Sequence, residues 1–301
     1  MKPVLVIALC LAGVAGAQAP TVSVSPSEPI PGSLVRFTLN DATGRNDAVV
    51  SARGTIAGEP MRFLMAEGGS FHAIGAIPVD ASDNVSASVT VQRASGASET
   101  VNVAIAIPHT EVPKTEQKLA VDQRFTRPLD AATQRRIARE NALAREVGKR
   151  AHDSPPRWNG PFSKPRDTRV TSDFGTGRTF NGRVASRHLG VDYAGAPGEP
   201  IRAANSGVVA LVDTFFLAGR VVYIDHGGGV VTGYFHLSKP LVTKGQTVAA
   251  GQVIGQVGST GRVTGPHLHW TARYGALTFN PSDLLSLDAQ SYSGSLQRAP
   301  D

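Results

Sequence analysis

The chain has 301 residues, of which 41% are hydrophobic and 18% are charged, and it contains a single cysteine. This length and apolar content suit one large or two ordinary folded domains and argue against a mainly disordered chain. The formal net charge of +6 suits an anionic partner. No motif or aromatic pattern of a nucleic-acid-binding protein accompanies that charge, so nucleic acid is not an expected partner.

Residues 1–19 have the pattern of a secretory signal peptide. A basic start is followed by an apolar run over residues 4–14, and Ala17-Gln18-Ala19 is a small-residue cleavage signal. The apolar run is too short to span a bilayer, and no later segment approaches the ~20 residues that a spanning helix needs. We therefore expect an exported protein with no membrane span, located in the periplasm, in the cell envelope or outside the cell.

The single cysteine, Cys10, lies inside this leader. Leu9 precedes it where a lipoprotein signal has a small residue, so we do not expect a lipid anchor. Because cleavage of the leader removes Cys10, the mature chain can form no disulfide, and its stability outside the cell must come from packing.

Residues 20–108 alternate apolar and polar side chains in short runs that turn residues separate. The runs lie at 21–24, 34–39, 86–91 and 101–105. This pattern is typical of short antiparallel strands and predicts a small β-sandwich of immunoglobulin-like kind. It carries no cluster of titratable groups, and its one histidine, His72, is isolated. The domain is therefore expected to position the protein or to bind a partner, or else to act as a pro-region that covers the groove of the next domain.

Residues 109–165 form a basic connector, with 12 Lys and Arg against 7 Asp and Glu. Its centre predicts one helix over 131–150, with Asp130 as the N-cap and with Lys149 and Arg150 suited to the C-terminal dipole. The apolar stripe is thin, which predicts that the helix lies on a neighbouring domain. A solvated charged surface explains the excess of positive charge, so at most weak contact with anionic envelope polymers is expected. His109 and His152 in this connector are not expected to be catalytic.

Residues 166–286 show little helix signal and many short strands separated by glycine turns. The strands are expected at 201–203, 207–212, 220–225, 230–235 and 253–257. The hairpin from 220 to 235 would place His236 just past the end of its second strand. Residues 287–301 are polar and are predicted to be a disordered tail.

Two histidine patterns in this last domain indicate a metal site. His188 and Asp192 are separated by three residues, and His267 and His269 by one. On a strand, His267 and His269 would point to the same side, roughly 7 Å apart. Three ligands of the His/His/Asp type with a fourth position left for water are what a catalytic zinc needs, whereas structural zinc is usually closed by four ligands rich in Cys.

These residues belong to a longer series of motifs, and here the chain resembles the lysostaphin-type, or LytM-type, zinc metallopeptidases, which are peptidoglycan endopeptidases. The matching blocks lie at 172–175, 188–193, 224–227, 234–237, 248–255, 258–261 and 265–269. The blocks occur in the family's order over about a third of the chain. A series of this length is far more specific than a lone His-x-His.

The resemblance implies a mainly β chain whose C-terminal domain is a twisted antiparallel sheet with an open groove. It implies one Zn²⁺ per chain, held by His188, Asp192 and His269, with His236 and His267 as the catalytic histidines. His226 falls in the family's hairpin turn and is not a ligand there. The sequence departs from the family at Phe235, where a small residue is common, and in the variable loop at 215–219.

The implied function is an exported, zinc-dependent endopeptidase that hydrolyses peptide cross-bridges of bacterial peptidoglycan through a zinc-activated water. Because no His-Glu-x-x-His motif offers a glutamate base, proton transfer and oxyanion stabilisation would fall to His236 and His267. The sequence leaves open whether glycine-containing or D-amino-acid bridges are cut.

Three other functions are open to the same sequence. A non-catalytic relative that binds the envelope or activates a hydrolase is one, although such relatives normally lack one or more zinc ligands. A biotinyl- or lipoyl-type carrier is suggested by the strand-turn pattern at 242–258, where Lys244 lacks the carrier's attachment sequence. A purely structural zinc or copper site is the third.

Overall fold

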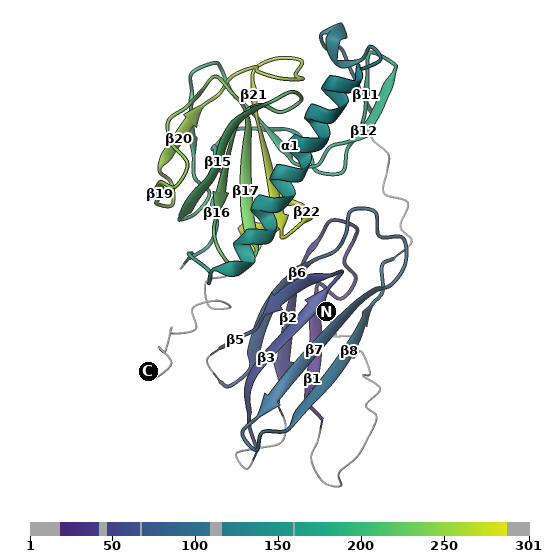
Figure 1. Ribbon diagram of the computed structural model, residues 1–301, viewed down its shortest axis with the longest axis vertical. Coiled ribbons are helices and arrows are strands. Elements are labelled where there is room, and N and C mark those ends of the chain that lie inside the picture. The colour runs from purple at the N-terminus through teal and green to yellow at the C-terminus, as the bar shows by residue number, and fades with distance from the viewer. Residues whose placement is uncertain (1–18, 42–46, 67, 109–115, 159, 288–301) are drawn as a thin grey trace. The chain divides into compact units, whose positions relative to one another are not determined.

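The computed structural model describes residues 19–41, 47–66, 68–108, 116–158 and 160–287 (Figure 1). Nearly all of the expected leader and of the expected disordered tail lies outside these residues, as does His109. The chain divides into two compact units, which within the described residues run up to 108 and from 116 to 286. No helix in the described part is both long and apolar enough to cross a membrane.

The first unit consists of two four-stranded antiparallel sheets. One sheet is ordered β1 (Thr21–Ser25), β2 (Leu34–Asn40), β6 (Phe71–Ala76) and β5 (Leu64–Met65), and the other β4 (Glu59–Arg62), β3 (Val49–Ile56), β7 (Val85–Arg93) and β8 (Ser98–Ile105). Alternate side chains of these strands are buried, among them Phe37, Leu39 and Val89, which are fully buried. The four strand runs expected from the sequence coincide with β1, β2, β7 and β8, while an immunoglobulin-like topology stays a prediction.

The second unit is built on an eight-stranded antiparallel sheet. Its order is β10 (Val170–Ser172), β13 (Val191–Ala194), β21 (His267–Tyr274), β17 (Val230–Leu237), β16 (Gly219–Asp225), β15 (Gly207–Phe215) and β19 (Thr247–Val248), and β22 (Leu277–Phe279) pairs with β21. The mainly β fold expected for this domain is therefore confirmed.

Two three-stranded sheets, three short 3₁₀ helices and one α-helix complete the described part of the second unit. The sheets are β12 (Val184–Arg187), β11 (Gly177–Phe180) and β9 (Glu116–Leu119), and β14 (Pro200–Arg202), β20 (Val253–Gln256) and β18 (Lys239–Pro240). The 3₁₀ helices are η1 (Gln123–Phe125), η2 (Ala151–Asp153) and η3 (Pro281–Ser286). The strand β9 comes from the expected connector and runs parallel to β11.

The expected helix is α1 (Ala131–Arg150), and its N-cap is Asp130, whose side chain accepts a hydrogen bond from the Thr133 N–H. Figure 1 shows α1 lying across β15, β16 and β17, which it contacts. Its buried side chains Ala144 and Val147 pack into one apolar cluster with residues of these strands. That cluster also holds Ala151, Leu211, Phe215, Val221, Tyr223 and Val231. The connector thus contributes α1 to the core of the second unit, and it adds β9 to a small sheet of that unit.

Candidate metal centre

Strand register brings the expected site residues to neighbouring positions on the large sheet. Asp192 on β13 lies directly opposite His269 on β21, and Phe235 on β17 lies opposite His269 from the other side. His267 shares a face of β21 with His269 because side chains on a strand alternate. His188 lies between β12 and β13, in the loop that leads into the strand of Asp192.

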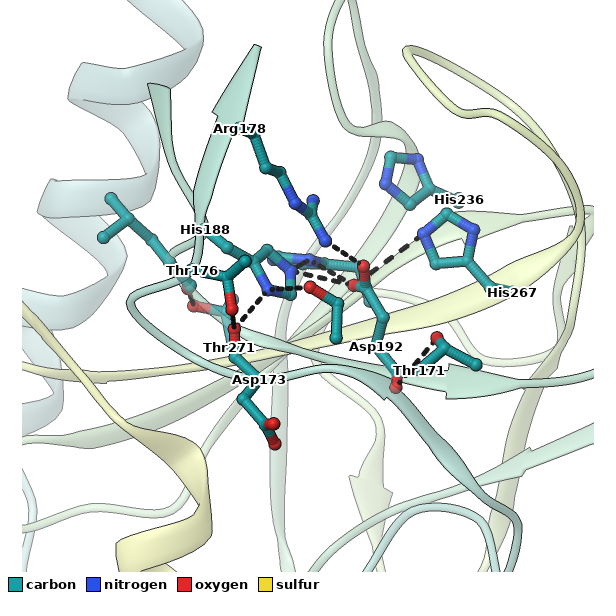
Figure 2. A network of polar contacts seen from close by, with 12 residues as sticks. Thr171, Asp173, Thr176, Arg178, His188, Asp192, His236, His267 and Thr271 are labelled. Carbon is teal, nitrogen blue, oxygen red and sulfur yellow. Dashed lines mark hydrogen bonds and ion pairs between the residues drawn. The ribbon is translucent and has the colours of Figure 1, made fainter. Parts of the chain in front are cut away.

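Three of these side chains converge, and Figure 2 shows two of them, His188 and Asp192, pointing toward each other. His188 Nε2 lies 2.9 Å from Asp192 Oδ1 and 2.9 Å from His269 Nδ1, and His269 Nδ1 lies 2.9 Å from Asp192 Oδ1. Ligand atoms about 2.0–2.1 Å from a tetrahedral zinc are roughly 3.3 Å apart, so the triangle needs to open by only a few tenths of an ångström. The donor set is compatible with one metal ion, as the sequence predicts.

The contacts of His188 fix which of its ring nitrogens faces the cluster. Its Nδ1 lies 2.9 Å from the Asp173 carbonyl oxygen, which can only accept, so Nδ1 carries the proton and Nε2 keeps its lone pair. A metal-ligating histidine commonly has such a partner for its other nitrogen. The Ser172 hydroxyl lies 3.3 Å from the same Nδ1 and donates to Gln117 Oε1 at 3.0 Å. The connector strand β9 thus reaches the surroundings of His188.

Asp192 is buried and ionised. Burial opposes its ionisation, but the neighbouring His188 and His269 outweigh that effect and hold the pKa of the Asp192 carboxyl well below its usual range. Arg178 on β11 adds an ion pair to Asp192 Oδ2 (Figure 2). Sequence reasoning missed Arg178, because nothing in its local sequence marks it as a partner of Asp192.

His269 and His236 are both held neutral near pH 7. Burial lowers the pKa of His269 to about 4, against the opposing effect of Asp192. Burial, and then the neighbouring His267 and His269, lower the pKa of His236 well below its ordinary value. Neutral imidazoles can accept a proton or bind a metal ion.

His236 lies within β17, and not past the end of the strand as the sequence suggested. A β-bulge between Tyr234 and Leu237 interrupts the pairing with β16, and His236 has a φ of 62°, a conformation that is uncommon outside glycine. Bulges of this kind redirect a side chain next to a functional site. The strand continues beyond the bulge, which is why its end was misplaced.

The two accessory histidines have the same tautomer. His236 Nδ1 lies 2.8 Å from the Thr260 carbonyl oxygen, and His267 Nδ1 lies 2.9 Å from the Gly265 carbonyl oxygen. Both Nδ1 atoms therefore carry the proton, and both Nε2 atoms are left as acceptors. The two rings are 4.9 Å apart, and His267 Nε2 lies 3.7 Å from Asp192 Oδ1.

Three residues singled out in the sequence have structural explanations. The Phe235 ring stacks on the His269 ring, with 5.1 Å between the ring centroids and 18° between the ring planes. The residue that departs from the family pattern therefore packs against an expected ligand. His226 lies in the β16–β17 turn, fully buried, with Ser206 O at 2.7 Å and Thr232 Oγ1 at 2.8 Å. It is not in the converging group. The ring of His152 packs edge-on against Tyr274.

Comparison with known proteins gives the same family. Residues 186–281 match the model of Peptidase family M23. The chain is 41% identical over 128 residues to peptidoglycan DD-endopeptidase ShyC of Vibrio cholerae, a match that covers 42% of this chain and 29% of that protein. It is 38% identical over 139 residues to DD-carboxypeptidase/endopeptidase Mpg of Neisseria meningitidis, covering 44% of this chain and 32% of that protein. The chain thus spans less than a third of the length of these curated relatives.

A solved structure from Pseudomonas aeruginosa, described as a peptidase M23, is 27% identical to this chain with a TM-score of 0.60. That likeness covers 85% of this chain and 94% of the other, so it extends beyond the segment that the family model matches. The family, the sheet and the converging donor set agree with the resemblance seen in the sequence motifs. The second unit of this chain therefore contains a peptidase family M23 domain.

Proposed function

We propose that this chain is an exported, zinc-dependent endopeptidase that hydrolyses the peptide cross-bridges of bacterial peptidoglycan. The observation that carries the proposal is the triangle of His188, Asp192 and His269, with His236 and His267 beside it. The names of the relatives, peptidoglycan DD-endopeptidase and DD-carboxypeptidase/endopeptidase, favour D-amino-acid bridges over glycine bridges. They also support a place of action in the cell envelope or outside the cell.

The three converging residues are the proposed ligands of one zinc ion. Bound there, zinc would lower the pKa of a water molecule and polarise the scissile carbonyl. Asp192 supplies a permanent negative charge, since its pKa is held low, and the hydrogen bond from His188 Nδ1 to Asp173 keeps His188 Nε2 directed at the cluster. Stacking of Phe235 on His269 limits rotation of the third ligand.

His236 and His267 are the proposed proton carriers. Peptide hydrolysis requires a proton to leave the attacking water and another to reach the leaving amine. In their neutral form both histidines present Nε2 as an acceptor, because each Nδ1 donates to a backbone carbonyl. Each can take up a proton there and then donate it to the developing oxyanion or to the leaving amine. Both residues line the cavity that adjoins Asp192.

The alternative of a non-catalytic envelope-binding relative is not favoured. Such a protein needs neither a complete donor set nor two histidines with matched tautomers, and this chain has both. The role of the first unit, as a positioning module or as a cover of the groove, stays a prediction.

Zinc content and turnover measured side by side test the roles. We expect His188→Ala, Asp192→Ala and His269→Ala to lose zinc and activity together, since each removes one of three ligands. His236→Ala and His267→Ala are expected to keep near-stoichiometric zinc and to lose on the order of 10² to 10⁴-fold in turnover. His72→Gln in the first unit is the matched control. If His267→Ala lost as much zinc as His269→Ala, the ligand assignment would be wrong.

The bond that is cut is tested by digestion of purified sacculi. The zinc-loaded chain is incubated with sacculi of glycine-bridge and D-amino-acid-bridge types, and mass spectrometry identifies the new peptide ends. New ends at D-amino-acid bridges alone are expected, and cleavage confined to glycine bridges would contradict the preference proposed above.

A further inference from the structure

A cavity of about 360 Å³ adjoins Asp192, one of the proposed zinc ligands, and positive side chains outnumber negative ones in its lining. Three arginines line it, Arg169, Arg178 and Arg262. Asp192 is the one acidic residue among the described residues of its lining. Because His236 and His267 also line the cavity, a group that binds there lies next to the bond that the proposed mechanism would cut.

Asp192 does not neutralise all three arginines. Its carboxylate already contacts His188, His269 and Arg178. The side chains of Arg169 and Arg262 have no hydrogen bond or ion pair with any residue that the structure describes. The lining therefore includes two arginines, the exposed Arg169 and the half-buried Arg262, that no described protein anion neutralises.

Arg262 is held in position although it has no ion pair. Its guanidinium carbon lies 4.0 Å from the centroid of the Phe180 ring, and its backbone N–H donates to the Leu217 carbonyl at 2.8 Å. Burial, and then the charge of Arg178, lower the pKa of Arg262. Partly buried like charges cost free energy unless an anion lies between them, and stacking on an aromatic ring leaves the guanidinium fork ordered for bidentate binding.

We propose that Arg262, together with Arg169, forms a subsite that binds a free carboxylate of the peptide substrate beside the scissile bond. The planar guanidinium fork matches a carboxylate in geometry and charge. Arg178 has a different task, since its ion pair orients the Asp192 carboxylate. The proposal rests on the endopeptidase function proposed above and narrows the substrate to peptides with a carboxylate near the cleaved amide, a group that the interior of a glycine bridge lacks.

Matched peptide pairs test the subsite in the zinc-loaded full chain. In the first pair the residue after the scissile amide ends in a carboxylate or in an amide. In the second pair its side chain is Glu or Gln. A charge-assisted hydrogen bond corresponds to roughly a tenfold to hundredfold preference, so kcat/KM is expected to favour the carboxylate member of one pair by that factor. The pair that shows the preference identifies whether the carboxylate is terminal or on a side chain.

Each variant is compared with the wild-type chain by the ratio of kcat/KM for the two members of a pair. The change in this ratio is expected to come mainly from KM. Arg262→Gln is expected to bring the ratio close to one, Arg262→Lys to retain part of it, and Arg183→Gln to leave it unchanged. Arg183 is an exposed arginine in the turn between β11 and β12. It does not line the cavity. As a readout without turnover, titration of the metal-free protein with the carboxylate-bearing product is expected to show weaker binding for Arg262→Gln.

The failures of the two proposals can be told apart. If the wild-type chain cuts no member of either pair and no sacculus, the endopeptidase function is wrong. If it cuts the peptides with a ratio near one in both pairs, or if Arg262→Gln keeps the wild-type ratio while its thermal unfolding is normal, the carboxylate subsite is wrong.

Discussion

Glu140 connects α1 to a loop that supports the site, and its removal is expected to destabilise the second unit. It is 7% exposed, its Oε2 accepts a hydrogen bond from the Phe216 N–H at 2.8 Å, and its Oε1 accepts from Arg136 Nε at 2.7 Å. The loop that follows Phe216 also accepts backbone hydrogen bonds from His236 and Arg262. One carboxylate on the helix thus stabilises the backbone beside two proposed functional residues.

The size of the effect follows from the lost hydrogen bond. Glu140→Ala leaves the Phe216 N–H without its partner, and a hydrogen bond to a charged group contributes about 1.5–3 kcal/mol. In a domain of 150–250 residues each kcal/mol shifts Tm by about 2–4 °C, so a decrease of about 3–12 °C is expected. Glu140→Gln keeps an acceptor oxygen and is expected to lose less than half as much.

Tryptophan fluorescence measures this unit alone, since both tryptophans of the chain, Trp158 and Trp270, are buried in it. The matched control is Glu146→Ala on the same helix. Glu146 pairs with Arg150 at 3.6 Å, and both side chains are more than half exposed, so its removal is expected to change the free energy of unfolding by at most about 1 kcal/mol. Equal Tm values for Glu140→Ala and Glu146→Ala would refute the reasoning.

Three further predictions concern the same unit. Gly190→Ala is expected to lower the zinc content, because the added Cβ would lie 2.5 Å from His269 Nε2. Gly265→Ala is the control and is expected to keep zinc, since a Cβ there meets open space. Metal analysis of both variants tests this difference. Burial lowers the pKa of His226 to about 4, below the unfolded value near 6.5. The contribution of His226 to the free energy of unfolding is therefore complete above pH 6.5 and falls toward pH 4, by about 2 kcal/mol between pH 7 and pH 5. Denaturation of His226→Gln at several pH values is expected to lack this part of the pH dependence. A chain that begins at residue 110 is expected to show the cooperative tryptophan transition, and one that begins at 166, without α1 and β9, is expected to lose it.

Local sequence patterns predicted the elements whose signal is regular. The helix α1 follows from its N-cap and from the helix-forming run after it, and β7 follows from strict alternation of buried and exposed side chains. The strand β3 was missed because Arg53 and Gly54 interrupt its apolar pattern. Gly54 has a tertiary reason, since a Cβ there would lie 2.5 Å from the Ser88 carbonyl oxygen on β7. A contact between strands that are distant in sequence leaves no periodic signal.

The site shows the same division between local and distant information. The spacings of His188 with Asp192 and of His267 with His269 are local, so they could be read from the sequence. The places of Gln117 and Arg178 depend on the parallel pairing of β9 with β11, which joins segments about 60 residues apart and has no motif. Arg262 was missed because its sequence neighbours are ordinary loop residues. Its place beside Asp192 and the two accessory histidines becomes visible only in the lining of the cavity.

The proposed ligands and the proposed proton carriers are supported by different parts of the fold. Asp192 and His269 lie on the paired strands β13 and β21, each of which has a neighbouring strand on both sides. The backbone of His236, in contrast, sits in a bulge and donates to Ala218 in the loop that Glu140 holds. Loosening that loop therefore disturbs His236 before it disturbs the donor triangle. We expect Glu140→Ala to keep near-stoichiometric zinc below its Tm while turnover falls, and a parallel loss of zinc and turnover would show that the loop supports the ligands as well.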